Sequence, residues 1–119
     1  MGWHSHNVDG RKYTWNVDRL FPLALELPRK RVKINSIPGL NDDCWFKGSS
    51  NPDARVPSIR NVAKHFKQML DADLNYPIII STDRNHLIDG AHRIAKALAY
   101  GYEDIEAVYM ELPEPDRID

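Results

Sequence analysis

The sequence predicts an α+β fold, a single small domain in which helices pack on a mixed β-sheet. Apolar residues recur at helical spacing over 59–70 and from Ile94 to Leu98. Short β-branched or alternating runs at 77–80, 86–88 and 105–110 are typical of strands. The 119 residues are enough for one hydrophobic core and too few for two, so we expect one domain over residues 1–119.

The amino-acid composition limits the classes of function that this protein can have. Hydrophobic residues make up 42% of the chain and charged residues 28%, as in ordinary globular proteins. The net charge of −1 provides no global attraction to nucleic acid or membranes. Cys44 is the only cysteine, which excludes an internal disulfide and a cysteine-based zinc site and suits a reducing compartment. No apolar run approaches the roughly twenty residues that span a bilayer. We therefore expect a cytoplasmic chain without membrane attachment.

The first part of the chain, residues 8–27, is predicted to extend the core with a strand and a short helix. Residues 1–7 are polar and are expected to be loose unless Trp3 docks on the body of the protein. Within them, His4 and His6 could bind a metal if they shared one face of a strand, but without nearby cysteine or carboxylate ligands such a pair is more often incidental, so no metal site is predicted. Alternation over 13–17 indicates a strand. The apolar segment 18–27, interrupted by a proline, indicates a helical turn.

Residues 28–57 are predicted to hold a strand and a long loop. Four cations in 28–33 precede the strand expected at 32–37, and they form either a nucleic-acid contact or, more commonly, a solvated approach to the strand. The loop 38–57 is long enough to be functional. Its aromatic pair needs cover, which predicts a lid or wall over the motif described below. In this loop, carboxylates could bind magnesium or act as a base, and a cation could contact phosphate, although such residues also form plain turns; these are Asp42, Asp43 and Arg55.

A helix is predicted from Ser58, a favourable N-cap residue that follows a proline. Its apolar residues form one continuous stripe. The opposite face carries cations and one histidine, and it either forms a shallow nucleic-acid patch or is simply solvated; its residues are Arg60, Lys64, His65 and Lys67. We expect His65 to be solvated rather than catalytic. At the other end of the chain, residues 112–119 are acidic and proline-containing, which predicts an extended tail.

The stretch 77–101 carries the chemistry. A buried strand, a turn and a second strand are followed by Asp89-Gly90 and then by a helix that ends near residue 101. The first turn of a helix has unpaired backbone N–H groups and a positive partial charge, and the small Gly90 and Ala91 let an anion approach them. Arg93 offers a planar fork for phosphate oxygens, and His92 can donate or accept a proton. Alternatively, Asp89 only caps the helix and the other residues are solvated.

The sequence Asp89-Gly90-Ala91-His92-Arg93, placed between a hydrophobic hairpin and a helix, resembles the signature of the ParB/sulfiredoxin-like superfamily. The similarity covers about residues 32–110, with only the five-residue motif being specific. The resemblance implies that the helix start binds nucleotide phosphates, with ATP, ADP or CTP as ligand and Mg²⁺ as a possible ion. Sulfiredoxins carry a nucleophilic cysteine where this chain has Ala91, so sulfiredoxin activity is not expected. The related serine kinase has a catalytic glutamate before its motif. In this chain, Glu26, Asp42 and Asp43 are candidates for that role only because they also precede the motif in the sequence.

Two functional hypotheses follow. The first is a nucleotide- or phosphate-binding domain, with phosphotransferase or NTPase activity as the corresponding chemistry. In it, Gly90, Ala91, His92, Arg93 and Arg55 hold phosphate, while Asp89 positions His92 or a magnesium-bound water. The second is a non-enzymatic nucleic-acid-associated interaction module of the kind found in phages and plasmids. It would use the cations of 29–31 and of the 59–70 helix.

Overall fold

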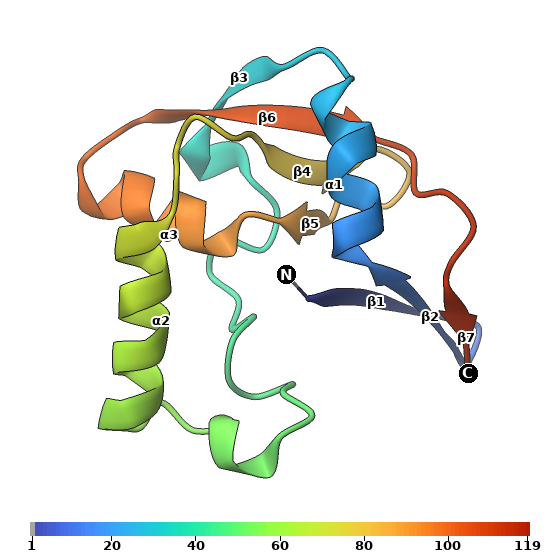
Figure 1. The fold of residues 1–119 in the computed structure, drawn as a ribbon, viewed down its shortest axis with the longest axis horizontal. Coiled ribbons are helices and arrows are strands. Elements are labelled where there is room, and N and C mark those ends of the chain that lie inside the picture. Colours follow the sequence, from blue (N-terminus) through green and yellow to red (C-terminus); the bar gives the residue numbers. More distant parts are fainter. Residues whose placement is uncertain (1) are drawn as a thin grey trace.

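The computed structural model describes residues 2–119 and confirms the α+β class (Figure 1). A hairpin and a short helix are followed by a long loop, and then by helices that alternate with strands. In chain order, the elements are β1 Trp3–Val8, β2 Arg11–Asn16, α1 Val17–Leu25, β3 Lys30–Lys33, the 3₁₀ turns η1 Ile34–Ser36 and η2 Pro52–Ala54, α2 Ile59–Asp71, β4 Ile78–Ser81, β5 Leu87–Asp89, α3 Ala91–Ala99, β6 Asp104–Met110 and β7 Arg117–Ile118.

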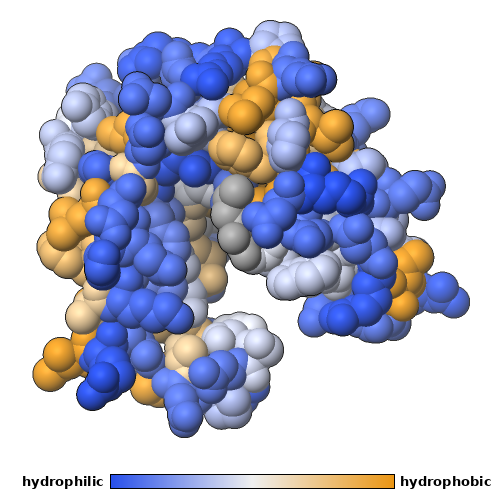
Figure 2. Space-filling model, viewed as in Figure 1, coloured by the Kyte–Doolittle hydropathy of each residue, from blue (hydrophilic) through white to orange (hydrophobic). Residues whose placement is uncertain are grey.

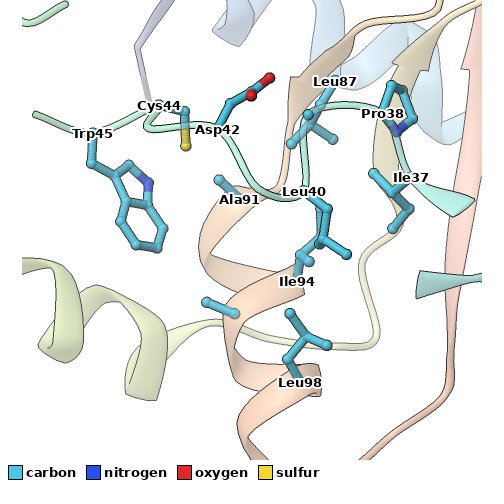
Figure 3. A pocket seen from close by; sticks show the side chains of 12 residues that line it. Ile37, Pro38, Leu40, Asp42, Cys44, Trp45, Leu87, Ala91, Ile94 and Leu98 are labelled. Atoms are coloured by element: carbon cyan, nitrogen blue, oxygen red, sulfur yellow. The ribbon is translucent and has the colours of Figure 1, made fainter. Parts of the chain in front are cut away.

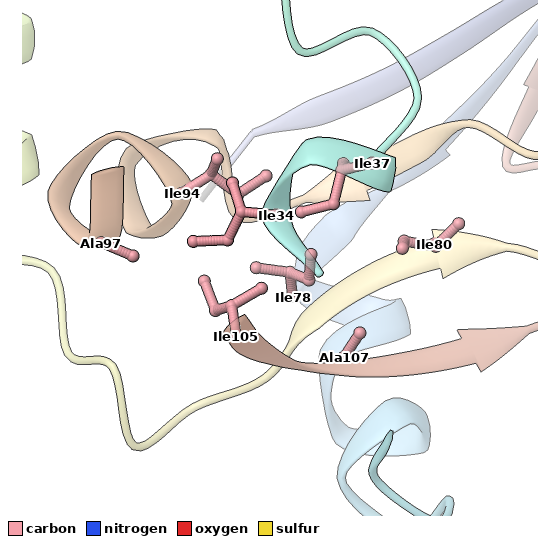
Figure 4. Packing of buried hydrophobic residues seen from close by; sticks show 8 residues of the cluster. All are labelled: Ile34, Ile37, Ile78, Ile80, Ile94, Ala97, Ile105 and Ala107. Atoms are coloured by element: carbon pink, nitrogen blue, oxygen red, sulfur yellow. The ribbon is translucent and has the colours of Figure 1, made fainter. Parts of the chain in front are cut away.

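The central sheet has the strand order β3-β6-β4-β5 and is mixed, as predicted. Strand β6 runs parallel to β4, whereas the β3–β6 and β4–β5 pairs are antiparallel. Every residue of β4 is buried. Ile78 and Ile80 pack with Ile94 of α3 on one face (Figure 4), while Ile79 packs with Leu20 of α1 on the other. Because helices cover both faces, the strand is a continuous β-branched run rather than an alternating one.

The N-terminal residues are ordered into a strand, so the prediction of a loose segment was wrong for residues 3–7; Met1 lies outside the described residues. Strand β1 pairs with β2, and β2 pairs with β7 at the other end of the chain. The indole Nε1 of Trp15 donates to the carbonyl of Pro113 at 2.8 Å, and Arg19 pairs with Asp116 at 3.0 Å. The predicted extended tail therefore forms a strand and closes a separate three-stranded sheet.

Two other predicted elements differ from the structure. The strand expected at 32–37 ends at Lys33, and the chain then turns through η1 so that Ile34 and Ile37 enter the core. Helix α2 begins as predicted, because the Ser58 hydroxyl accepts a hydrogen bond from the backbone N–H of Asn61. Its apolar stripe, however, does not reach the core, and no residue of α2 is buried. Within residues 2–119, none of the helices is both long and apolar enough to cross a membrane.

Three histidines connect β1 to the turn that precedes β5. Nε2 of His4 lies 3.0 Å from Nε2 of His6, and Nδ1 of His6 lies 3.0 Å from Nδ1 of His86. His6 thus uses both ring nitrogens, so the four facing nitrogens do not converge on one point. No group of three or more potential ligand residues among 2–119 can hold a metal ion. Burial, reinforced by His6 and His86, lowers the pKa of His4 from 6.5 to about 4.

Acid should destabilise the fold as the pH falls from 6.5 towards 4. Over this range unfolded His4 binds a proton, whereas folded His4, with its pKa of about 4, does not. His4→Gln keeps a hydrogen-bonding side chain that does not titrate. Urea unfolding at a series of pH values should therefore show a smaller acid-induced loss of unfolding free energy in His4→Gln than in the wild type. Equal losses in the two proteins would contradict this assignment.

Gly90 fixes the junction between β5 and α3. Its φ of +118° lies in the region that favours glycine, and it serves as the N-cap residue of α3. A Cβ at this position would lie 2.5 Å from Cγ2 of Ile78 and 2.9 Å from its Cβ. Since Ile78 is fully buried in β4, it cannot move aside at low cost. Position 90 therefore needs glycine for both its backbone conformation and its packing.

Gly90→Ala should lower the free energy of unfolding by about 3 kcal/mol, through a strained φ and steric overlap with Ile78. Gly101→Ala is a matched control, because Gly101 also has a positive φ of +82° but has nothing within 4 Å of its added Cβ. We expect this control to cost only about 1 kcal/mol. Urea unfolding of both variants measures the difference, and equal costs would show that the contact with Ile78 is unimportant.

Candidate functional site

The predicted motif lies where β5 passes into α3. Asp89 ends β5, Gly90 turns the chain, and Ala91 begins the helix. The first intrahelical hydrogen bond runs from the N–H of Ile94 to the carbonyl of Gly90 at 2.9 Å, and glycine offers no capping side chain. The N–H groups of residues 91–93 therefore have no acceptor among residues 2–119. Together with the helix dipole, these three donors favour an anion at this position.

Arg93 is held by Asp89 rather than extended into solvent. Its Nη2 donates to Oδ2 of Asp89 at 2.9 Å, and the two side chains are only 13% and 21% exposed. The Nε of Arg93 is buried and has no hydrogen-bond partner within the described chain. Asp89, predicted to position His92, instead fixes the guanidinium group of Arg93. The arginine therefore approaches the helix start in a fixed orientation, with one buried donor, Nε, still unused.

Breaking this ion pair should be costly. In Arg93→Met, Asp89 keeps its charge without a partner, and we expect the free energy of unfolding to fall by about 2 kcal/mol. Asp89→Asn should have a similar cost. The double variant should lose less than the sum of the two, with a coupling energy of about 1 kcal/mol. Urea unfolding of the wild type, the two single variants and the double variant measures this coupling energy. Strictly additive costs would mean that the ion pair contributes no net stability.

His92 pairs with His65 of α2, which the sequence predicted to be solvated; that prediction was wrong. Nδ1 of His65 lies 2.9 Å from Nε2 of His92, and the rings are inclined by 12° with centroids 5.2 Å apart. These values describe two nearly coplanar imidazoles that share an edge-to-edge hydrogen bond. Trp45 of the long loop stacks over both rings, at 5.0 Å from His65 and 4.9 Å from His92. The predicted wall over the motif is therefore present in the structure.

The histidine pair is neutral near pH 7. Burial lowers the pKa of His92, and the neighbouring His65 lowers it further, although Asp89 opposes the shift. Burial, followed by Lys64, lowers the pKa of His65, and Asp43 opposes this. Two neutral imidazoles that share one hydrogen bond leave one outer nitrogen as a donor and the other as an acceptor, and the two tautomers exchange these roles. The pair can thus both donate to a ligand and accept a proton.

A cavity of about 130 Å³ lies beside the first turn of α3 (Figure 3). Trp45 forms one wall, and its indole Nε1 is buried without a hydrogen-bond partner among residues 2–119. Figure 3 shows this nitrogen on the side of the ring that faces Ala91. The remaining lining is mostly apolar, with one carboxylate and one thiol; it comprises Ile37, Pro38, Gly39, Leu40, Asp42, Cys44, Leu87, Ala91, Ile94, Ala95 and Leu98.

The structure separates the other loop candidates. Asp42 lines the cavity. Asp43 instead accepts hydrogen bonds from the backbone N–H groups of residues 45–47. These hydrogen bonds lower the pKa of Asp43 and hold the loop in its conformation. Arg55 donates through Nε to the carbonyl of Ser49 at 2.9 Å and does not line the cavity. Of the three loop residues proposed to act on a ligand, only Asp42 is brought to the site.

Cys44 also lines the cavity, although it is distant from the motif in sequence. It is exposed overall, but partial burial of the thiol, reinforced by Asp43 and Asp42, raises its pKa. The group is therefore a thiol rather than a reactive thiolate near pH 7. Its position beside Ala91 brings sulfur to the motif, yet its protonation state does not favour nucleophilic chemistry.

The cations at 29–33 are compensated by the neighbouring strand β6. Arg29 and Arg31 both approach Glu106, at 3.1 Å and 4.0 Å, and Lys33 pairs with Asp104 at 3.2 Å. Lys30 lies over the ring of Tyr109 at 5.6 Å. Two carboxylates thus face four cations, so the cluster keeps about half of the positive charge that its sequence implies.

Sequence reasoning missed two groups that shape the site. His65 was assigned to the outer face because the apolar stripe of α2 was expected to face the core. In the structure, the less exposed residues of α2 instead recur every four positions, at Asn61, His65 and Met69. The long loop was predicted to cover the motif, but the cavity that it forms with α3 beside Trp45 was not predicted. Comparison of the chain with protein-family models, curated proteins and solved structures finds no match.

Proposed function

We propose that this protein binds a nucleotide or another phosphorylated small molecule at the first turn of α3. The main support is a set of unused donors on this turn and beside it: three backbone N–H groups, Nε of Arg93, and Nε1 of Trp45, whose ring stacks on His92. Buried polar atoms without partners are uncommon in folded proteins, so several at one place favour a ligand rich in acceptor oxygens. A phosphate group has that chemistry.

The cavity would take the uncharged part of the ligand. Its walls are largely apolar, and Trp45 offers an aromatic edge and one N–H donor. A nucleobase combines a flat apolar body with acceptor atoms, which suits such walls. ATP, ADP and CTP, the nucleotides that the resemblance to the ParB/sulfiredoxin-like superfamily implies, are the ligands to test first. Mg²⁺ commonly binds through one or two carboxylates together with phosphate oxygens, and Asp42 is the carboxylate that lines this cavity.

Phosphotransferase or NTPase activity is a further step of the same proposal. A general base for such a reaction needs an accepting nitrogen near neutral pH, which the His65–His92 pair supplies. Arg93, held in place by Asp89, would stabilise negative charge on the transferred group. Asp89 would act through Arg93 in this scheme rather than through His92.

Ala91→Asp provides a direct binding test. A carboxylate at the first position of α3 is favourable for the helix dipole but repels a phosphate at the same place. The matched control is Ile59→Asp, which puts the same residue at the first position of α2. Thermal unfolding with ATP, ADP or CTP, with and without Mg²⁺, should raise the wild-type Tm by at least about 3 °C near saturation. We expect the shift to persist in Ile59→Asp and to vanish in Ala91→Asp.

The absence of a shift with every nucleotide and with inorganic phosphate would contradict the proposal, as would equal shifts in the two variants. The alternative function, a nucleic-acid-associated interaction module, predicts a different outcome. It requires steeply salt-dependent binding of DNA or RNA that is unchanged in Ala91→Asp. The pairing of the β3 cations with β6 does not favour this alternative.

A further inference from the structure

The proposed phosphate site has little net positive charge of its own. Nη2 of Arg93 donates to Oδ2 of Asp89 at 2.9 Å, so the guanidinium charge is offset within the site. The start of α3 contributes roughly half a positive charge. A phosphate monoester near neutral pH carries about one and a half to two negative charges. In the absence of a metal ion, such a ligand stays incompletely compensated unless another group at the site becomes positive.

The His65–His92 pair is the group whose charge can change there, because imidazole is the side chain that ordinarily titrates near neutral pH. His92 is the second residue of α3, so it belongs to the same helical turn as the unused backbone donors. Nδ1 of His65 and Nε2 of His92 face each other at 2.9 Å. The other two ring nitrogens, Nε2 of His65 and Nδ1 of His92, are the outer nitrogens. In the neutral pair, one outer nitrogen donates and the other accepts.

The geometry of the pair suits one added proton but not two. A proton on the accepting outer nitrogen turns both outer nitrogens into donors and makes the hydrogen bond between the rings charge-assisted. Trp45 stacks over both rings, with centroids at 5.0 Å and 4.9 Å, and an aromatic face stabilises a cation. A second proton would leave two N–H groups and two positive charges facing each other. The pair can therefore supply one positive charge, shared between two rings.

The surroundings of the pair do not supply that charge before a ligand binds. Burial is the main cause that lowers the pKa of both imidazoles, so the free pair is neutral near pH 7. One cation and one carboxylate also act on each ring and oppose each other; they are Lys64 and Asp43 for His65, and Arg93 and Asp89 for His92. Figure 2 shows mainly hydrophilic residues over α2, the helix that carries His65, on the face that it displays. Water next to this helix can provide the proton.

We infer that the site is specific for a terminal phosphate group, which it binds as a dianion together with one proton acquired by the His65–His92 pair. The inference rests on the proposed phosphate site at the start of α3. The proton comes from water, bonds to the accepting outer nitrogen and returns to water when the ligand leaves; no other covalent bond forms or breaks. A phosphodiester carries a single negative charge and gains less from the added positive charge. Phosphomonoesters are thus bound in preference to the backbone phosphates of nucleic acid.

The coupling between anion and proton has a defined sign. A bound dianion raises the pKa of the pair, so the bound protein holds more protons than the free protein at any pH between the two pKa values. The affinity for a dianion must therefore increase as the pH falls through this range. Because the coupling is reciprocal, a rise of about one pKa unit corresponds to about a tenfold gain in affinity.

Sulfate is the probe for this coupling, because it has the shape of phosphate and remains a dianion near neutral pH, so any titration belongs to the protein. The full chain is titrated with sulfate at constant ionic strength without Mg²⁺, and binding is followed by NMR at the backbone amides of residues 91–93. We expect the affinity to increase about fivefold to tenfold from about pH 8 to about pH 6. Near pH 7, sulfate should move the ring-nitrogen signals of His65 and His92 towards the imidazolium values and leave those of the other three histidines unchanged.

Two variants identify the titrating group. The double variant His65→Gln/His92→Gln keeps hydrogen-bonding side chains but removes the titration of the pair, so its sulfate affinity should vary less than about twofold over the same pH range. His4→Gln is the matched control, because it removes a histidine outside the site and should retain the wild-type pH dependence. The ring-nitrogen signals of the wild type test the same point if the double variant does not fold.

A pair of nucleotides tests the preference for a terminal phosphate. AMP and cyclic AMP share base and sugar, but the phosphate of cyclic AMP is a diester; near pH 7, AMP should bind at least about tenfold more tightly. Three results would overturn the inference and leave the phosphate site intact: amides of 91–93 that respond to sulfate without any change at the two rings, a sulfate affinity independent of pH, or equal binding of AMP and cyclic AMP. No response of these amides to sulfate or AMP would contradict the proposed function itself, and the inference with it.

Discussion

The contact of Gly90 with Ile78 is the constraint on which the rest of the site depends. It lets the backbone of the β5–α3 junction lie directly on β4, at a distance that no side chain at position 90 would permit. Since β4 is buried on both faces, the junction rests on a close-packed part of the fold. The start of α3 is thereby fixed in position and direction. Its N–H groups without acceptors are thus held in place in advance, and such preorganisation lowers the entropic cost of binding an anion.

Around this fixed start, the site is assembled from segments that are distant in sequence. The long loop supplies Trp45, and Asp43 holds the loop by accepting three backbone hydrogen bonds. Helix α2 supplies His65 and is itself tied to α3 through Lys96. Trp45 and His65 are thus each held in position by contacts other than those with His92. Changes in the loop or in α2 would consequently alter the site while leaving the central sheet intact.

The sequence predicted those features that depend on local chemistry. Strand β4 is a β-branched run, Ser58 is a capping residue, and Gly90 and Gly101 occupy positive-φ positions next to α3. It could not predict features that depend on remote partners. Strand β1 is polar and gains its order from β2, which in turn pairs with the C-terminal β7. Likewise, amphipathicity alone could not reveal that α2 turns His65, rather than its apolar stripe, towards the body of the protein.

The distribution of unpaired donors distinguishes the helix start from the other cationic parts of the chain. On β3, each cation contacts a carboxylate or an aromatic ring of β6, and the two carboxylates offset part of the positive charge. At the start of α3, by contrast, the single carboxylate of Asp89 engages only one nitrogen of Arg93, and the donors of Trp45 and of the helix backbone stay unmatched. This contrast is the reason why we propose the start of α3, rather than β3, as the place where a ligand binds. Acceptor oxygens from outside the chain are what would balance that site.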